Sequence, residues 1–310
     1  MDNKTIIEKA TMTLNRLASG GLMNPQQFST FYRKLIDQPT IMNEARTTPM
    51  SSDQMKIEKI GFGQRILRVG QEATPLDANQ RAIPTTDKVE LNAKEVIAEV
   101  NISYDTLENN IEGNNLQNTI MSMITERASL DIEELIINGD KASSDPYLAL
   151  FDGIRKQASQ HVVDVAGGQF GADVLKKLYG SIPAKYLRDP QAFRYYMSTI
   201  NELNWRDLVS KRQTNLGDST LTSANRPMAY GVPVSPVAML QPYKNAATDV
   251  SDILLTNPKN ILFGVSRNVR LEFDKDIRAR TFIIVLTMKL DAKFEEADAV
   301  AKAINVAHTF

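Results

Sequence analysis

Two stretches of mixed apolar and charged residues, 56–69 and 88–102, are rich in β-branched side chains and predict a pair of extended strands. The polar residues between them, 70–87, contain two prolines and predict a mobile tip. Each limb could reach about 45 Å at roughly 3.3 Å per residue. An isolated two-stranded ribbon is only marginally stable in water. The pattern therefore predicts a long hairpin, residues 55–103, that needs a partner, and the simplest partner is a second copy of the chain.

The apolar positions of the second limb change phase at Lys94 and Glu95. Before this point they are Val89, Leu91 and Ala93, and after it Val96, Ala98, Val100 and Ile102. A phase change of one residue turns every side chain to the opposite face. We therefore expect a bulge or a change of packing partner here. The outer part of the hairpin would face a neighbour and the inner part the chain's own core.

Helical periodicity precedes and follows this hairpin. Residues 2–19 and 24–36 predict two amphipathic helices, followed by an extended strap up to residue 53. Such a start is typical of an arm, and the alternative is a small helical cap on the same subunit. The strongest helix, 115–138, ends before Gly139 and would be roughly 35 Å long at 1.5 Å per residue. It predicts a spine beside which the C-terminal strands return.

The middle region, residues 161–256, predicts a separate α/β unit. Its elements are a helix at 172–179, a strand at 193–197, a helix at 200–211, an exposed loop at 213–226 and an edge strand at 229–236. Two short strands, 253–256 and 261–264, flank a turn at Asn257 and Pro258. The C-terminal strands are expected at 269–274 and 281–288.

The amino-acid composition excludes several classes of function but does not identify one. The 310 residues are 42% hydrophobic and 24% charged, which is typical of a globular protein. A formal net charge of -1 argues against a surface that grips nucleic acid. The absence of cysteine excludes disulfides, thiolate zinc sites and thiol nucleophiles. The longest apolar run, 282–286, is too short to cross a bilayer, so we expect a chain that is soluble and cytoplasmic when made.

Candidate chemistry is sparse, and we predict no catalytic, cofactor-binding or metal-binding residues. His161 and His308 lack metal-ligand spacing, and the glycines around Phe62 lack the third glycine of a dinucleotide loop. Trp205 is expected in a helix core or interface. Two acidic clusters are more typical of solvated helix faces than of cation sites: Asp131, Glu133 and Glu134, and Asp291, Glu295, Glu296 and Asp298.

The order of these elements is more specific than any one motif. Five segments carry it: residues 20–28 continuing to Ala45, Arg46 and Met50; 102–108; 128–139 continuing to 152–154; 230–234; and 253–264. On these residues the chain resembles the tailed-bacteriophage major capsid protein family, with the Hong Kong 97-type fold. The resemblance covers nearly the whole sequence.

This resemblance implies an α+β capsid fold in four parts. They are an N-terminal arm (1–54), an extended loop or β-hairpin (55–103), a peripheral domain with the spine helix (104–160 and 257–310), and an inserted axial α/β domain (161–256). It implies a non-enzymatic chain that self-assembles through pentamers and hexamers into an icosahedral shell around double-stranded DNA. It also implies a virion protein assembled in the host cytoplasm, with scaffolding, portal and decoration proteins as partners. Because the arm starts near Met1, we expect a separate scaffolding protein or numbering after processing.

Two alternative functions remain at this point. An encapsulin-type compartment shares the fold, and a soluble α/β ligand-binding protein or enzyme would need a pocket in the middle unit. Some relatives cross-link a lysine of the extended loop, where this chain has Lys88 and Lys94, but solvated lysines are the simpler interpretation.

Overall fold

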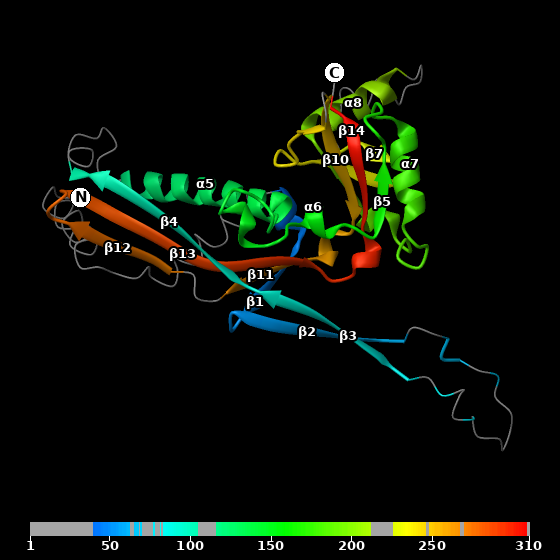
Figure 1. The fold of residues 1–310 in the computed structure, drawn as a ribbon, viewed down its shortest axis with the longest axis horizontal. Coiled ribbons are helices and arrows are strands. Elements are labelled where there is room, and N and C mark those ends of the chain that lie inside the picture. The colour runs from blue at the N-terminus through cyan, green and yellow to red at the C-terminus, as the bar shows by residue number, and fades with distance from the viewer. Residues whose placement is uncertain are drawn as a thin grey trace, which may run out of the picture.

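The computed structural model of the chain describes residues 40–62, 65–67, 69, 77, 81, 83–104, 116–211, 226–245, 248–266 and 270–308. The predicted helices at 2–19 and 24–36, most of the predicted tip and residues 213–225 of the predicted loop lie outside this part. Two sheets lie side by side, and a narrow two-stranded ribbon extends away from them (Figure 1).

The first sheet is built around one long strand, β13 (Thr281–Phe294). On one side β13 pairs antiparallel with β11 (Ile261–Ser266) and β12 (Arg270–Asp276), and on the other with β4 (Lys94–Ser103). The fifth strand, β1 (Arg46–Met50), pairs in parallel with β11. The predicted strap is therefore not wholly extended: it begins with a short helix, α3 (Thr40–Glu44), and continues as β1.

The spine helix is confirmed as α5 (Leu116–Asn138), lying along this sheet (Figure 1). Leu135 and Ile136 belong to the same core cluster as the inward residues of β13. Those residues alternate along the strand: Ile284, Leu286, Met288 and Leu290. The helix ends at Gly139, where an added Cβ would lie 2.5 Å from the Phe151 carbonyl oxygen.

The second sheet has the order β5 (His161–Asp164), β14 (Ala301–Ala307), β10 (Thr248–Thr256), β6 (Arg194–Met197), β8 (Val232–Pro236) and β7 (Met228–Ala229). A seventh strand, β9 (Tyr243–Asn245), pairs with β10. The predicted helices are present as α7 (Ala172–Ser181) and α8 (Thr199–Ser210). The other helices of the described residues are α6 (Ile154–Gln157) and four 3-10 turns: Leu148–Leu150, Pro190–Ala192, Pro258–Asn260 and Ala297–Ala299.

Two predictions about this second sheet were wrong. Residues 301–307 do not return to the spine sheet but form β14, between β5 and β10, because small buried side chains such as Ala301 and Ala303 fit the middle of a sheet. The strand at 232–236 is not outermost, because the two-residue strand β7 covers it.

The inner end of the hairpin stops short of residue 103. Among the described residues β2 (Gln54–Gly61) pairs with β3 (Thr85–Asn92), and β4 belongs to the spine sheet. The phase change therefore marks the predicted change of partner, with Ala93 alone between β3 and β4. The ribbon points away from the far end of β4 (Figure 1).

Candidate assembly surfaces

A small apolar cluster holds the base of the hairpin on the spine sheet. Leu91 and Ala93 pack with Met50, and Met55 and Ile57 cover them from β2. Gly264 of β11 makes this approach possible, because an added Cβ would lie 2.8 Å from the Met50 sulfur and 3.1 Å from Leu91. The base of the hairpin is thus buried within one copy of the chain.

Buried backbone donors at the same place are satisfied by Asp291. One of its carboxylate oxygens accepts a hydrogen bond from the Asn92 backbone N–H at 2.7 Å, and the other accepts from the Ala292 N–H at 2.9 Å. Burial raises the pKa of Asp291, and these two N–H donors oppose the increase. Asp291 was expected on a solvated face, but it is buried because it pairs a backbone group of the hairpin.

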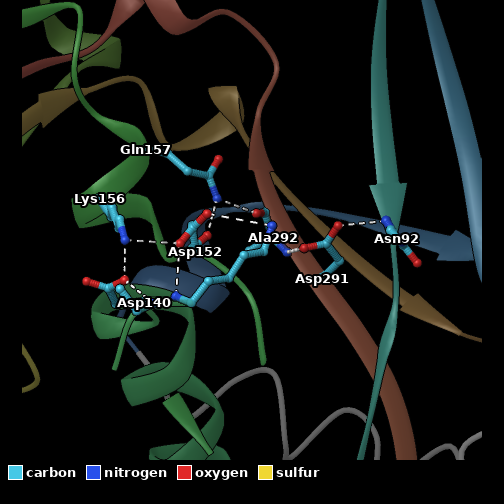
Figure 2. A network of polar contacts seen from close by, with 9 residues as sticks. Asn92, Asp140, Asp152, Lys156, Gln157, Asp291 and Ala292 are labelled. Carbon is cyan, nitrogen blue, oxygen red and sulfur yellow. Dashed lines mark hydrogen bonds and ion pairs between the residues drawn. The ribbon is translucent and has the colours of Figure 1, made fainter. Parts of the chain in front are cut away.

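Figure 2 shows how the Asp291 contact continues into a wider polar network. The Gln157 side chain donates to the Ala292 carbonyl at 2.8 Å. Lys156 pairs with Asp140, just after the spine helix, and lies 3.5 Å from Asp152. The hydrogen bond from Lys156 lowers the pKa of Asp140. The hairpin base, the spine helix and α6 are therefore linked in one rigid unit.

The loop in this unit packs backbone against backbone. The Gly153 N–H donates to the Gly139 carbonyl at 2.8 Å. A Cβ on Gly153 would lie 2.7 Å from the Gly139 nitrogen and from the carbonyl oxygens of Ile136 and Ile137. Only glycine permits this contact.

The outer hairpin differs sharply from its base. Two cross-strand ion pairs, Lys56 with Glu90 at 2.8 Å and Lys88 with Glu58 at 3.1 Å, keep one face of the ribbon polar. Beyond them six large apolar side chains are exposed, next to exposed charged residues such as Arg65 and Asp87: Ile60, Phe62, Ile66, Leu67, Val69 and Ile83. Leu67 is 79% exposed and Val69 is 89% exposed. Exposed apolar side chains concentrated on one segment are typical of an interaction surface.

A second candidate surface is an apolar groove between the spine helix and β4. It encloses about 700 Å³ and is lined by Ala98, Val100, Asn101, Ile102, Ser103, Ile120, Met123, Ile124, Arg127, Ala128 and Asp131. Met123 on its helical wall is 63% exposed. Its residues come from β4 and α5, and both elements extend towards the end of the molecule opposite the hairpin (Figure 1).

A polar network joins the two sheets. The Arg155 Nε donates to Asp252 of β10 at 2.6 Å, and the guanidinium lies 4.5 Å from the centre of the Tyr243 ring. The Tyr243 hydroxyl donates to the other Asp252 oxygen at 2.9 Å. Burial, and then the Asp252 charge, raise the pKa of Tyr243. Arg155 also donates to Asn138 at the end of the spine helix, which couples the sheets through α6.

The sequence-based candidates for chemistry are dispersed. Glu133, expected on a solvated face, is buried, and its carboxylate accepts the Ile41 N–H of α3 at 3.0 Å. Burial raises the pKa of Glu133. Within the described part of the chain no three His, Cys, Asp or Glu residues gather to hold a metal ion. Trp205 is buried in the core of the second sheet, as predicted. Sequence reasoning missed Arg155 and Tyr243, and no motif marks them.

Lys88, a candidate for cross-linking, is exposed and paired with Glu58. His308 is partly buried, and this burial lowers the pKa of its imidazole. Among the described residues no helix is long and apolar enough to cross a membrane.

Comparison with a protein-family model identifies the family of this chain. The model of the phage capsid family matches residues 20–303, nearly the whole chain. The chain belongs to the phage capsid family. It is 58% identical over 310 residues to YqbE of Bacillus subtilis (strain 168), a prophage capsid protein by its name, and the match spans 99% of each chain.

Solved structures share the fold of this capsid protein at low identity. A chain of the satellite phage P4 procapsid with its size determination protein aligns with a TM-score of 0.67 and 16% identity, over 99% of this chain and 98% of that one. The SrpI encapsulin of Synechococcus elongatus PCC 7942 gives 0.60 and 13%, over 89% and 90%. The capsid of a native GTA particle gives 0.60 and 15%, over 88% and 91%. The fold is the α+β Hong Kong 97-type capsid fold, as predicted.

Copies of a capsid protein form a homo-oligomeric shell. Surfaces that are exposed in one copy are therefore candidates for contacts with neighbouring copies. Membership of a structural family favours a role without catalysis.

Proposed function

We propose that this chain is the major head protein of a tailed bacteriophage, whose pentamers and hexamers build an icosahedral shell around double-stranded DNA. The observation that carries the proposal is the hairpin, whose base is locked into its own subunit while its apolar outer part has no such support. On its own, a two-stranded ribbon of this kind is at best marginally stable in water, and a neighbouring molecule can stabilise it. In a shell every copy has such a neighbour.

Each of the two sheets corresponds to one domain of the proposed capsid subunit. The spine sheet with α5 acts as the peripheral domain, and the second sheet as the axial domain, whose loops meet at the centres of capsomers. The described strands modify the expected boundaries, since β4 joins the peripheral sheet and β14 the axial one. The hydrogen bonds of Arg155 and Tyr243 to Asp252 connect the two parts.

The shell encloses DNA without gripping it. A net charge of -1 leaves little general attraction for phosphates, which dominate non-specific DNA binding. Such a wall lets the genome be packed and released. Scaffolding, portal and decoration proteins are the expected partners, with assembly in the host cytoplasm.

Electron microscopy of the purified chain, alone and with its genomic neighbours, tests the proposal. Closed shells or free pentamers and hexamers support it, and a uniform small particle under all conditions contradicts it. A deletion of residues 70–80 sharpens the test, because it spares the paired strands β2 and β3. We expect unchanged circular dichroism and loss of shells, whereas normal shells would argue against the hairpin's role.

The structural similarity to an encapsulin supports a second candidate function, a compartment that encloses an enzyme. The contents of purified shells decide between the two. Nuclease-resistant double-stranded DNA in shells made with the phage neighbours supports the head protein, and a co-purifying enzyme supports the compartment.

A further inference from the structure

The end of the spine helix contains a chemically labile pair of residues. Asn138 is followed by Gly139, and no other asparagine of the 310 residues precedes a glycine. In such a pair the glycine nitrogen can attack the side-chain carbonyl carbon of asparagine, because the glycine has no Cβ to hinder the approach. Ammonia leaves and a five-membered succinimide forms, which water then opens to aspartate or isoaspartate. Asn138 is therefore the side-chain amide of this chain that is most prone to deamidation.

The packing of the chain requires the glycine that makes Asn138 labile. A Cβ on Gly139 would lie 2.5 Å from the Phe151 carbonyl oxygen and 2.6 Å from the Leu135 carbonyl oxygen. Any larger residue at position 139 would slow the reaction but would collide with these two backbone atoms. Protection of Asn138 has to come from the conformation of the folded chain.

The folded chain restrains each group that the reaction needs. Asn138 is the last residue of α5, and the Gly139 N–H donates to the Leu135 carbonyl at 2.9 Å, so the attacking nitrogen still belongs to the helical hydrogen-bond pattern. The Asn138 Nδ2 donates to the Met239 carbonyl at 2.8 Å. The Asn138 Oδ1 accepts from the Arg155 Nη1 at 3.2 Å. A carboxamide that is held at both ends cannot turn its carbon towards the Gly139 nitrogen.

Both side-chain restraints depend on the contact between the two sheets. Met239 lies in the turn after β8 of the second sheet, and Arg155 is bonded to Asp252 of β10. We call these contacts of Asn138, Arg155, Met239 and Asp252 the sheet junction. A local opening that separates the two sheets at this junction releases both ends of the Asn138 carboxamide at once.

A second labile pair lies directly against the first. Asp152 and Gly153 form the only Asp-Gly pair of the sequence, which can cyclise in the same way with loss of water. The Gly153 N–H donates to the Gly139 carbonyl at 2.8 Å, and the Asp152 side chain accepts from the Lys141 N–H at 3.0 Å. Isoaspartate at either position would add one atom to the backbone where even a Cβ has no room. A modified unit could not return to this packing.

We propose that Asn138 is a deamidation site that the closed sheet junction suppresses and that opening of the junction activates. The reaction exchanges the side-chain amide for a carboxylate, consuming one water and releasing ammonia. The carboxylate has no N–H for the Met239 carbonyl, and isoaspartate does not fit beside Gly153, so the modification permanently marks a chain whose sheets have separated. This inference concerns the folded chain and does not depend on the proposed shell.

The test follows deamidation of the purified full-length chain in mildly alkaline buffer, by peptide mass spectrometry at Asn138. We expect the folded chain to react at least about twenty-fold more slowly than the chain unfolded in guanidinium chloride, because the site is reached only through opening. Arg155→Met removes one restraint and weakens the junction, so it should raise the rate in the folded chain at least three-fold. Arg127→Met, which breaks an exposed ion pair on the same helix, is the matched control and should leave the rate unchanged.

A second control places the same labile pair outside the junction. Tyr230→Asn creates an Asn-Gly pair in the turn between β7 and β8, where residue 230 is 49% exposed and has a φ of 51° that asparagine tolerates. We expect this pair to deamidate at least ten-fold faster than Asn138 in the same folded molecule. Equal rates at the two positions would overturn the proposal, because folding in general would then be the protection. Equal rates at Asn138 in the folded and unfolded chain, or in Arg155→Met and Arg127→Met, would overturn it too.

Discussion

The two halves of the hairpin are built from similar residues but are stabilised in different ways. At the base Leu91 is 1% exposed, lies beside Gly264 and is followed by Asn92, whose N–H is bonded to Asp291. Further out, Leu67 has the same side chain and is almost fully exposed. The base is stabilised within one subunit, and our proposal assigns the stabilisation of the outer half to assembly. Substitutions should therefore separate cleanly into those that destabilise the subunit and those that impair only the shell.

The largest effect is expected where the anchored unit packs backbone against backbone. Gly153→Ala places a methyl group 2.7 Å from three backbone atoms, which cannot move aside as a flexible side chain would. We expect the free energy of unfolding of the unassembled subunit, from urea titration, to fall by about 4 kcal/mol. Gly171→Ala is the control, since its added Cβ meets nothing within 4 Å. Equal stability of the two variants would contradict this packing.

The next effect concerns the link between the sheets. Arg155→Met leaves the Asp252 carboxylate buried without its cation, and breaking such a pair costs about 3 kcal/mol. Arg127→Met removes an exposed pair with Asp131 on the spine helix and should cost less than about 0.5 kcal/mol. Thermal unfolding of both variants measures the difference. Similar losses would show that the interdomain pair is no more important than a surface pair.

Leu91→Ala and Leu67→Ala test the comparison directly. The first removes a fully buried side chain and should lower the free energy of unfolding by about 2.5 kcal/mol. The second should change the subunit by less than about 0.5 kcal/mol but reduce the yield of shells, scored by sedimentation. A Leu67→Ala subunit that is destabilised yet assembles normally would reverse our interpretation of the two halves.

The smallest effect is a pH dependence at the hairpin base. Because burial raises the pKa of Asp291 in the folded subunit, the folded state binds the proton more tightly than the unfolded state. The wild type should therefore gain stability relative to Asp291→Asn as the pH falls through the raised pKa towards the ordinary value of 3.8. The lowered pKa of Asp140 predicts the opposite trend against Asp140→Asn below that value. Urea titrations between pH 2.5 and 7 distinguish the two, and parallel curves would contradict the assignment.

Local patterns predicted the elements well and their partners less well. The stripe of α5 and the strand-like limbs of the hairpin follow from side-chain periodicity, which a sequence displays directly. The change of phase at Lys94 predicted where β3 gives way to β4. The new partner, β13, lies about 190 residues further along the chain, and pairing at that separation leaves no local signature.

The errors have the same origin. β14 was missed because its alanines carry little strand signal, and its place between β5 and β10 is decided by packing. Glu133 and Asp291 look like surface acids in the sequence, but each accepts a buried backbone N–H from a distant segment. Arg155 and Tyr243 meet only because two sheets are brought together, so only the fold reveals them.

The position of β14 has a consequence for synthesis. Among the described strands it is the last to leave the ribosome, yet it lies between β5 and β10, strands made at least forty residues earlier. The second sheet cannot close until translation is almost complete, so in a nascent or prematurely terminated chain β5 and β10 lack the strand that lies between them. We therefore expect chains that end before β14 to lack a closed second sheet and to be unable to join the shell.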